Sequence, residues 1–321
     1  MCAHSRAPAD WQTGTVIVVV CPGQGSQTPG FLAPWLAESA FADRLAGLSE
    51  AAGLDLAAHG TESDADTIRD TRVAQPLIVA AGILTLGALL ADGRDARIGG
   101  IAGHSVGEIT AAAGSGVLTD AEAMRFVAER GRAMAAAAAE VATGMSAVIG
   151  ADEAELLARL AELGLEPANF NGGGQLVVAG ALDALEQLKA EPPAGSRVIP
   201  LQVAGAFHTR YMQPAAARLG EVAATLAPAD PAIPLWTNHD GSRVASGADF
   251  VALLVGQVSS PVRWDRCMES FGEAGVTGII EVAPAGALVG LAKRALKGVP
   301  TVAVKTPDDL PAAIELIEQA A

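Results

Sequence analysis

Ser105 lies in a sequence pattern that is typical of an activated serine nucleophile. It is the central residue of the G-x-S-x-G pattern at residues 103–107, which follows an apolar run from Ile98 and precedes a short helical segment at 109–113. A strand, a sharp turn and a helix form the context in which such a nucleophile elbow presents its hydroxyl group. The two glycines make the turn possible, because a Cβ there would collide with the adjoining strand and helix. We therefore expect acyl-group chemistry at Ser105.

A serine hydroxyl needs a general base beside it, and histidine is the usual base near neutral pH. The chain has five histidines. His208 is the best candidate, because it follows the elbow in chain order and lies in a loop before a helical segment. His104 should point away from the serine. The remaining histidines lie in the N-terminal leader, a polar stretch and a turn, at positions 4, 59 and 239.

The sequence offers no clear carboxylate to orient the imidazole of His208. Asp120, Asp152 and Asp183 lie between Ser105 and His208, but each begins a helical segment and suits a capping role. A main-chain carbonyl can also accept the Nδ1–H of an imidazole. A Ser-His dyad oriented by a carbonyl group is therefore favoured over a triad.

Arg130 is the cation with the most informative position, because its helix directly follows the elbow. An arginine on a mostly apolar helix usually extends its charged end to solvent. The alternative is a fixed cation in an acyl pocket, where the planar guanidinium binds a carboxylate through two hydrogen bonds. The local sequence leaves both interpretations open.

A second glycine-rich loop, at residues 21–27, follows the first apolar strand. Such a loop can bind phosphate, but this one has neither of the two common phosphate-binding patterns. A hydrolase-like elbow needs one oxyanion donor from an early loop besides the residue after the nucleophile. We therefore favour a main-chain N–H of this loop as an oxyanion donor.

The segments around these residues alternate between strand and helix character. The β-branched run at 15–20 and the run from Ile98 are typical of buried parallel strands, and residues 120–140 have helical composition throughout. From Gly144 to Val203 we predict a compact βαβαβ run, which suits a small α+β insertion.

The predicted fold is therefore α/β, with a parallel sheet in the larger part. Residues 1–137 and 205–321 are expected to form a large catalytic domain, and residues 138–204 a small inserted subdomain.

The composition excludes several classes of protein. A formal net charge of −15 over 321 residues argues against nucleic acid or an anionic membrane as a partner. The three cysteines, at 2, 21 and 267, are widely spaced and predict neither disulfides nor a metal site. No apolar run of 18 or more residues is free of charges and helix breakers, and the first fourteen residues lack the apolar core of a signal peptide. We expect a cytoplasmic protein with a loose N-terminal leader.

Six motifs together resemble those of malonyl-CoA:acyl carrier protein transacylases, the stand-alone acyltransferases of dissociated fatty acid and polyketide synthesis. The resemblance runs from about Val16 to the C-terminus, and the motifs stand in the family's order. They are GQGSQ at 23–27, GHSVGE at 103–108, RG-x-x-M at 130–134, N-x-N-x-x-x-Q at 169–175, GAFH at 205–208 and Q-x-x-x-P-V-x-W at 257–264.

This resemblance implies a ping-pong transfer of a malonyl group from coenzyme A to acyl carrier protein. Ser105 would form the acyl ester, His208 would act as base and then acid, and Arg130 would hold the malonyl carboxylate. It also implies an α/β-hydrolase-like core with a ferredoxin-like subdomain. No metal or bound redox cofactor is expected.

The matching motifs imply further roles. Gln24 and Val106 would supply the oxyanion N–H groups, and the main-chain carbonyl of Gln257 would orient the base. Gln175 is expected to bind the substrate. Phe207 resembles the residue of family members that take malonyl rather than methylmalonyl groups.

The sequence departs from the family pattern at two places. Ala135 stands where many members carry Gln, and residues 283–286 replace a more glycine-rich turn; neither change removes an expected catalytic group.

Two other functions are possible for a protein with this elbow. A serine esterase or thioesterase would use the same elbow with water as the acceptor. A binding protein with an inactive acyltransferase fold would lack the serine, histidine or arginine, and all three are present.

The expected partners are malonyl-CoA and acyl carrier protein, and the enzyme is expected to be a monomer. Acyl carrier proteins are strongly acidic, so an acidic enzyme needs a local basic patch to attract one. Lys293, Arg294 and Lys297 are the candidates for this patch. An ordinary solvated helix face is the alternative interpretation of these cations.

Overall fold

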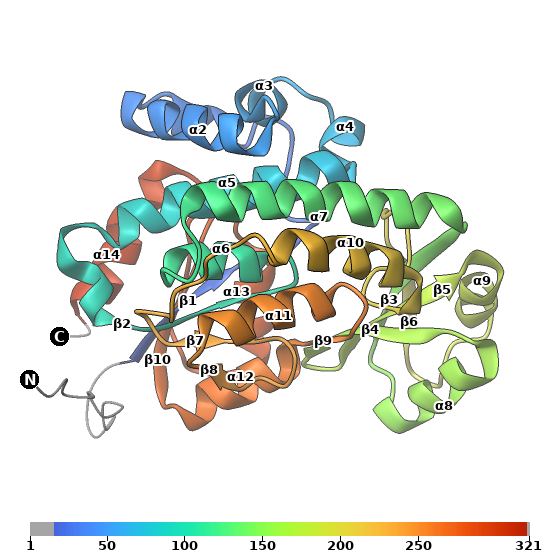
Figure 1. Cartoon of the computed structure of the whole chain (residues 1–321). Coiled ribbons are helices and arrows are strands. Elements are labelled where there is room, and N and C mark those ends of the chain that lie inside the picture. Colours follow the sequence, from blue (N-terminus) through green and yellow to red (C-terminus); the bar gives the residue numbers. More distant parts are fainter. Residues whose placement is uncertain (1–15, 320–321) are drawn as a thin grey trace, which may run out of the picture.

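The protein contains two β-sheets with helices packed around them, and its computed structural model describes residues 16–319 (Figure 1). The predicted leader, with Cys2 and His4, lies outside the described residues. The larger sheet has six strands in the order β11-β10-β1-β2-β7-β8. They are β1 (Val16–Cys21), β2 (Ile98–Gly103), β7 (Leu235–Trp236), β8 (Arg243–Val244), β10 (Val276–Glu281) and β11 (Thr301–Ala303).

Strands β1 and β2 lie at the centre of the larger sheet. Every residue of both strands is buried, and β1 pairs in parallel with β10 on one side and β2 on the other. Alternate residues of β1 contribute to two different hydrophobic clusters, which explains why the strand is apolar on both faces. Because the strands are parallel, Cys21 ends beside Gly103. The two glycine-rich loops are therefore neighbours at one edge of the sheet.

Helices pack against the larger sheet, and the long helices α5 and α7 run side by side (Figure 1). The predicted helix at 120–140 is confirmed with the same bounds. The α-helices of this part are α1 (Ala33–Leu36), α2 (Ser39–Ala52), α3 (Leu56–Thr61), α4 (Ala65–Arg69), α5 (Thr71–Leu89), α6 (Gly107–Gly114), α7 (Asp120–Glu140), α10 (Gln213–Ala223), α11 (Gly247–Gln257), α12 (Trp264–Glu273), α13 (Ala287–Ala295) and α14 (Leu310–Glu318). Short 3-10 helices lie at η1 (Ala91–Arg97), η2 (Arg210–Met212) and η3 (Pro307–Asp309).

Helix α5 belongs to the core of the protein. By length and composition alone it is apolar enough to cross a membrane, but 78% of the tested stretch is buried inside the protein. It packs against α7 and α6. Its start is fixed by Asp70, whose side chain accepts the main-chain N–H of Arg72 as a helix cap.

The smaller sheet has five strands in the order β6-β3-β5-β4-β9. The prediction of a βαβαβ run is wrong by one strand, because β4 was not foreseen. The sequence of β4, EPANFNG, alternates between apolar and polar residues only over residues 168–171, and it includes a proline and two asparagines, which are depleted in strands. The observed order is β3 (Thr143–Ile149), α8 (Glu153–Leu163), β4 (Glu166–Gly172), β5 (Gln175–Ala181), α9 (Leu182–Ala190) and β6 (Arg197–Pro200). This βαββαβ order is ferredoxin-like.

Strand β9 (Val262–Arg263) joins the smaller sheet from outside the predicted subdomain. It pairs in parallel with β4, where Val262 lies beside Asn169. The boundaries at 138 and 204 stay predictions, but the smaller sheet includes two residues that were assigned to the large domain. The reason is that edge pairing of a sheet depends on which backbone lies next to it in space, not on chain order.

Candidate active site

Ser105 lies at the tip of a sharp turn between β2 and α6. Its φ of 53° places it in the left-handed region, which side chains rarely adopt. The glycines on either side make this turn possible: a Cβ on Gly103 would collide with the backbone of Gly107, and a Cβ on Gly107 with the carbonyl of Cys21. The expectation that both positions need glycine is confirmed.

His208 lies directly against the nucleophile. Its Nε2 is 2.7 Å from Ser105 Oγ, and its Nδ1 is 2.9 Å from the main-chain oxygen of Gln257. Because a carbonyl oxygen only accepts, Nδ1 carries the proton and Nε2 is free to accept the serine proton. Burial, and then the positive charge of Arg130, lower the pKa of His208 to about 3. The imidazole is therefore neutral and able to act as a base across the neutral range.

The aspartates weighed as orienting groups lie elsewhere. Asp120 forms an ion pair with Arg44, and Asp152 caps α8 by accepting the N–H of Glu155. Asp183 lies in the first turn of α9. The arrangement is a dyad with a carbonyl partner, as the sequence favoured.

Arg130 projects from α7 to the nucleophile and is 1% exposed, which excludes a solvent-directed side chain. Its Nη2 donates to Ser105 Oγ at 3.3 Å and to Gln257 Oε1 at 2.8 Å. Its Nη1 is buried and has no hydrogen-bond partner within residues 16–319. Burial lowers the pKa of Arg130 to about 10, so the guanidinium stays charged at neutral pH. A buried cation with an unused donor beside a nucleophile is suited to bind a carboxylate.

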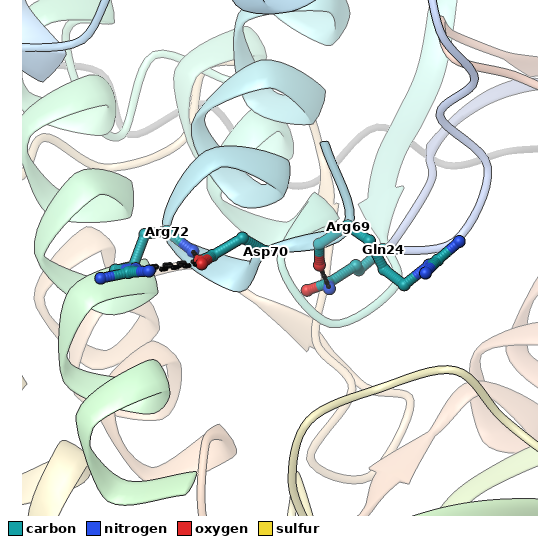
Figure 2. A network of polar contacts seen from close by, with 4 residues as sticks. All are labelled: Gln24, Arg69, Asp70 and Arg72. Carbon is teal, nitrogen blue, oxygen red and sulfur yellow. Dashed lines mark hydrogen bonds and ion pairs between the residues drawn. The ribbon is translucent and has the colours of Figure 1, made fainter. Parts of the chain in front are cut away.

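Gln24 lies in the loop after β1, beside the elbow. Its side-chain Nε2 donates to the main-chain oxygen of Arg69 at 3.2 Å, which ties the loop to the corner between α4 and α5 (Figure 2). At the same corner Asp70 forms an ion pair of 2.5 Å with Arg72, two residues further along the chain (Figure 2). Val106 precedes the first turn of α6, where main-chain N–H groups have no partner within the helix. The N–H groups of Gln24 and Val106 thus stay the predicted oxyanion donors.

Ser105 and His208 line a cavity of about 570 Å³ between the two sheets. Its walls combine amide side chains with apolar ones, and both predicted substrate-binding residues, Gln175 and Phe207, line it together with Gln24. Arg294 also lines it, whereas Lys293 and Lys297 are exposed and lie outside the lining. Another cavity, of about 580 Å³, lies among α2, α7 and α10 and contains no candidate nucleophile.

His104 lines the same cavity but does not contact the nucleophile's hydroxyl. Its Nε2 is 2.9 Å from Asn171 Oδ1, and its ring packs edge-on against Trp264. Burial lowers the pKa of His104. This neighbour of Ser105 therefore joins the elbow to the wall that β4 forms.

Two residues at the site were missed from the sequence. Asn238, after β7, accepts the N–H of Ser105 at 2.8 Å through Oδ1 and donates to the Gly103 oxygen at 2.7 Å through Nδ2. Glu108, in the first turn of α6, is 1% exposed and accepts the N–H of Asn238 at 2.6 Å. The available signal for Glu108 was a lone carboxylate in an otherwise uncharged, apolar helix (GEITAAAG).

Comparison with known proteins agrees with this geometry. Residues 18–308 match the acyl transferase domain family. The malonyl CoA-acyl carrier protein transacylase of Mycobacterium tuberculosis is 50% identical over 299 residues, which are 92% of this chain and 98% of the relative. The protein of the same name from Escherichia coli K12 is 34% identical over 309 residues, covering 94% and 100% of the two chains.

Solved structures give the same result. The crystal structure of MCAT from M. tuberculosis matches with a TM-score of 0.90 at 50% identity, over 93% of this chain and 99% of that one. A malonyl-transacylase in complex with its holo type II PKS acyl-carrier protein matches with a TM-score of 0.88 at 32% identity, over 94% and 99%. The prediction of a hydrolase-like α/β core with a ferredoxin-like subdomain is confirmed by this likeness. The chain belongs to the malonyl CoA-acyl carrier protein transacylase family of acyltransferases.

Proposed function

We propose that this enzyme transfers a malonyl group from malonyl-CoA to the phosphopantetheine thiol of an acyl carrier protein, through an ester on Ser105. The observation that carries this proposal is the position of Arg130, whose buried Nη2 lies 3.3 Å from the nucleophile and whose Nη1 is unused among the described residues. Relatives named for this activity support it.

The residues of the dyad supply both proton transfers. In the first half-reaction Ser105 gives its proton to Nε2 of His208 while Oγ attacks the thioester carbonyl; the C–S bond then breaks and the coenzyme A sulfur takes the proton. In the second, the carrier thiol gives its proton to Nε2 and attacks the ester carbonyl, and Ser105 leaves with that proton. The N–H groups of Gln24 and Val106 stabilise the oxyanion in both steps.

Ser105→Ala should abolish the covalent intermediate, because Ser105 carries the hydroxyl group that is hydrogen-bonded to His208, whereas Ser26, which also lines the cavity, donates to the Gly23 oxygen. Intact mass spectrometry after addition of malonyl-CoA measures this directly. The wild type should gain the mass of one malonyl group, and the variant none. A persisting adduct on the variant would remove Ser105 as the nucleophile.

Arg130 explains selectivity for an acyl group that carries a carboxylate. An acetyl group leaves the buried Nη1 of the guanidinium without an acceptor, and an unmet buried donor costs roughly 1–3 kcal/mol. Arg130→Ala should therefore lower kcat/KM for malonyl-CoA at least about tenfold and spare or improve acetyl transfer. Equal losses with both donors would contradict a carboxylate-binding role.

Transfer assays with malonyl-, methylmalonyl- and acetyl-CoA, with and without holo acyl carrier protein, test the function as a whole. Malonyl should be preferred over methylmalonyl, since Phe207, which precedes His208 in the chain, lines the cavity. The product should accumulate on the carrier. Rapid release of free malonate without any carrier would instead identify a thioesterase.

The proposal also covers the domain division, the cellular location, the oligomeric state and the docking surface of the enzyme. Residues 138–204 form the ferredoxin-like subdomain, and the rest of the chain forms the catalytic domain. The enzyme acts in the cytoplasm as a monomer and needs no metal or redox cofactor. The carrier docks near Lys293, Arg294 and Lys297, of which the first two lie at the end of α13, beside the cavity mouth that Arg294 lines.

A further inference from the structure

Glu108 is a buried carboxyl group behind the nucleophile that the proposed reaction does not use. Its Oε1 accepts the main-chain N–H of Asn238 at 2.6 Å, and its Oε2 accepts from Nε2 of Gln257. Both oxygens thus face donors. Burying a carboxylate in an apolar helix costs free energy unless hydrogen-bond donors meet it. The Asn238 N–H and the Gln257 NH2 group therefore fix the position of Glu108, and Glu108 fixes theirs.

The hydrogen bonds from Glu108 continue to Arg130 through one side chain. Gln257 is 7% exposed, and its Oε1 accepts from Nη2 of Arg130 at 2.8 Å. A guanidinium only donates, so Gln257 must present its oxygen to Arg130 and its NH2 group to the opposite side. On that side Nε2 donates to Glu108 and, at 3.2 Å, to the main-chain oxygen of Ser105. Glu108 is the charged acceptor on this side, so it reinforces the orientation that Arg130 requires.

We infer that Glu108 is a positioning residue that holds the Gln257 amide in one orientation and thereby fixes Arg130 for a malonyl rather than an acetyl group, an inference that rests on the proposed function. Glu108 also gives Arg130 a counter-charge without a direct ion pair, because the amide lies between them. Nη1 of Arg130 therefore stays available to the substrate carboxylate.

The protonation state of Glu108 controls how firmly the amide is held. Burial raises the pKa of Glu108 to about 8, against the opposing effects of its hydrogen bonds and of Arg130. A protonated Glu108 carries a hydrogen on one oxygen and has lost its negative charge, so it accepts more weakly from the Asn238 N–H and the Gln257 NH2 group. The Gln257 amide, and with it the Arg130 guanidinium, is then held less firmly.

The other ionisable groups around Glu108 do not change charge in this range. Arg130 on α7 has a pKa of about 10, and burial raises the pKa of the Cys267 thiol on α12 far above neutrality. His208 stays neutral because its pKa is about 3. The preference for malonyl over acetyl should therefore rise with pH between about 6.5 and 9, as Glu108 loses its proton.

The test compares kcat/KM for malonyl-CoA and acetyl-CoA, with one holo carrier protein, in wild type and Glu108→Gln. The Gln side chain has the size of Glu, but it places an NH2 group where Asn238 and Gln257 both need an acceptor. At about pH 9, where Glu108 of the wild type has lost its proton, we expect the malonyl-to-acetyl ratio of the variant to be at least about tenfold lower, mainly through a higher KM for malonyl-CoA, with acetyl transfer within about threefold of wild type. The ratio in the variant should no longer depend on pH.

Glu281→Gln is the matched control. Glu281 is also fully buried, and its carboxyl group accepts three main-chain N–H groups at the start of α13, at 2.9–3.0 Å. This control should lose stability but keep the malonyl-to-acetyl ratio. A ratio in folded Glu108→Gln that equals wild type would overturn the inference. If Glu108→Gln does not fold, the wild type still tests the inference: a malonyl-to-acetyl ratio that does not change between about pH 6.5 and 9 would overturn it. Wild type that transfers no malonyl would defeat the proposed function instead.

Discussion

At the residue scale, the charge of Arg130 acts on the base as well as on the substrate. It is the second cause, after burial, that lowers the pKa of His208. A malonyl carboxylate bound to Arg130 cancels that charge, so the imidazole becomes a stronger base when the correct acyl group is in place. Selectivity and basicity are therefore coupled through one guanidinium group.

The low pKa of His208 predicts an unusual pH profile for acylation. With acetyl-CoA, which does not engage Arg130, the rate of Ser105 acylation should be flat from about pH 5 to 7.5, because the free imidazole takes up a proton only near pH 3. Intact mass spectrometry of timed samples measures the rate. A decline centred near the ordinary histidine value of about 6.5 would show that His208 is not desolvated as described.

At the element scale, the turn between β2 and α6 is held from two directions. The backbone of Cys21 on β1 lies against Gly107, and Asn238 after β7 binds both sides of the turn. The left-handed conformation of Ser105 persists because these neighbours leave no other arrangement.

Gly107→Ala should lower the free energy of unfolding by about 2–4 kcal/mol, because the added Cβ meets main-chain atoms that cannot move aside. Urea denaturation followed by circular dichroism measures the change. Gly220→Ala, in α10, is the control: nothing lies within 4 Å of its added Cβ, so it should stabilise the protein by about 0.5–1 kcal/mol. Equal effects of the two substitutions would contradict the steric argument.

Local chemistry could be predicted at this scale, and long-range contacts could not. The elbow, the buried strands and α7 follow from the glycine positions, β-branched runs and helix composition of single segments. Strand β4 was missed because its proline and two asparagines favour a loop, and its pairing with β5 outweighs that local preference. Asn238 matches none of the six motifs, and Glu108 ends the GHSVGE motif without an expected role; only the fold shows that the two residues contact each other at the site. The sequence could not predict whether Arg130 is buried, since the sequence of α7 alone does not show which face of the helix packs inward.

At the scale of the whole molecule, the net charge of −15 opposes the approach of an acidic carrier. Lys293, Arg294 and Lys297 are exposed, and none of them belongs to an ion pair among residues 16–319. An unpaired group of cations beside the cavity is the place where local attraction can exceed the overall repulsion.

Lys293→Glu should raise the KM for holo acyl carrier protein at least about fivefold at low ionic strength, and added salt should shrink the difference. Lys189→Glu, on α9, makes the same charge change on an exposed residue that does not line the cavity, and it should have little effect. Steady-state transfer at several salt concentrations checks both. Similar KM values for the two variants would argue against docking at α13.

Strand β9 also limits how the two parts of the molecule can move. The N–H of Arg263 donates to the main-chain oxygen of Asn238 at 2.8 Å, and β4 pairs with the same short strand at Asn169, in the cavity wall. A hinge rotation that widened the cleft would have to break this pairing or pull on the residue that holds Ser105. This pairing therefore opposes widening of the cavity, into which, in the proposed reaction, the pantetheine arms of donor and carrier extend one after the other.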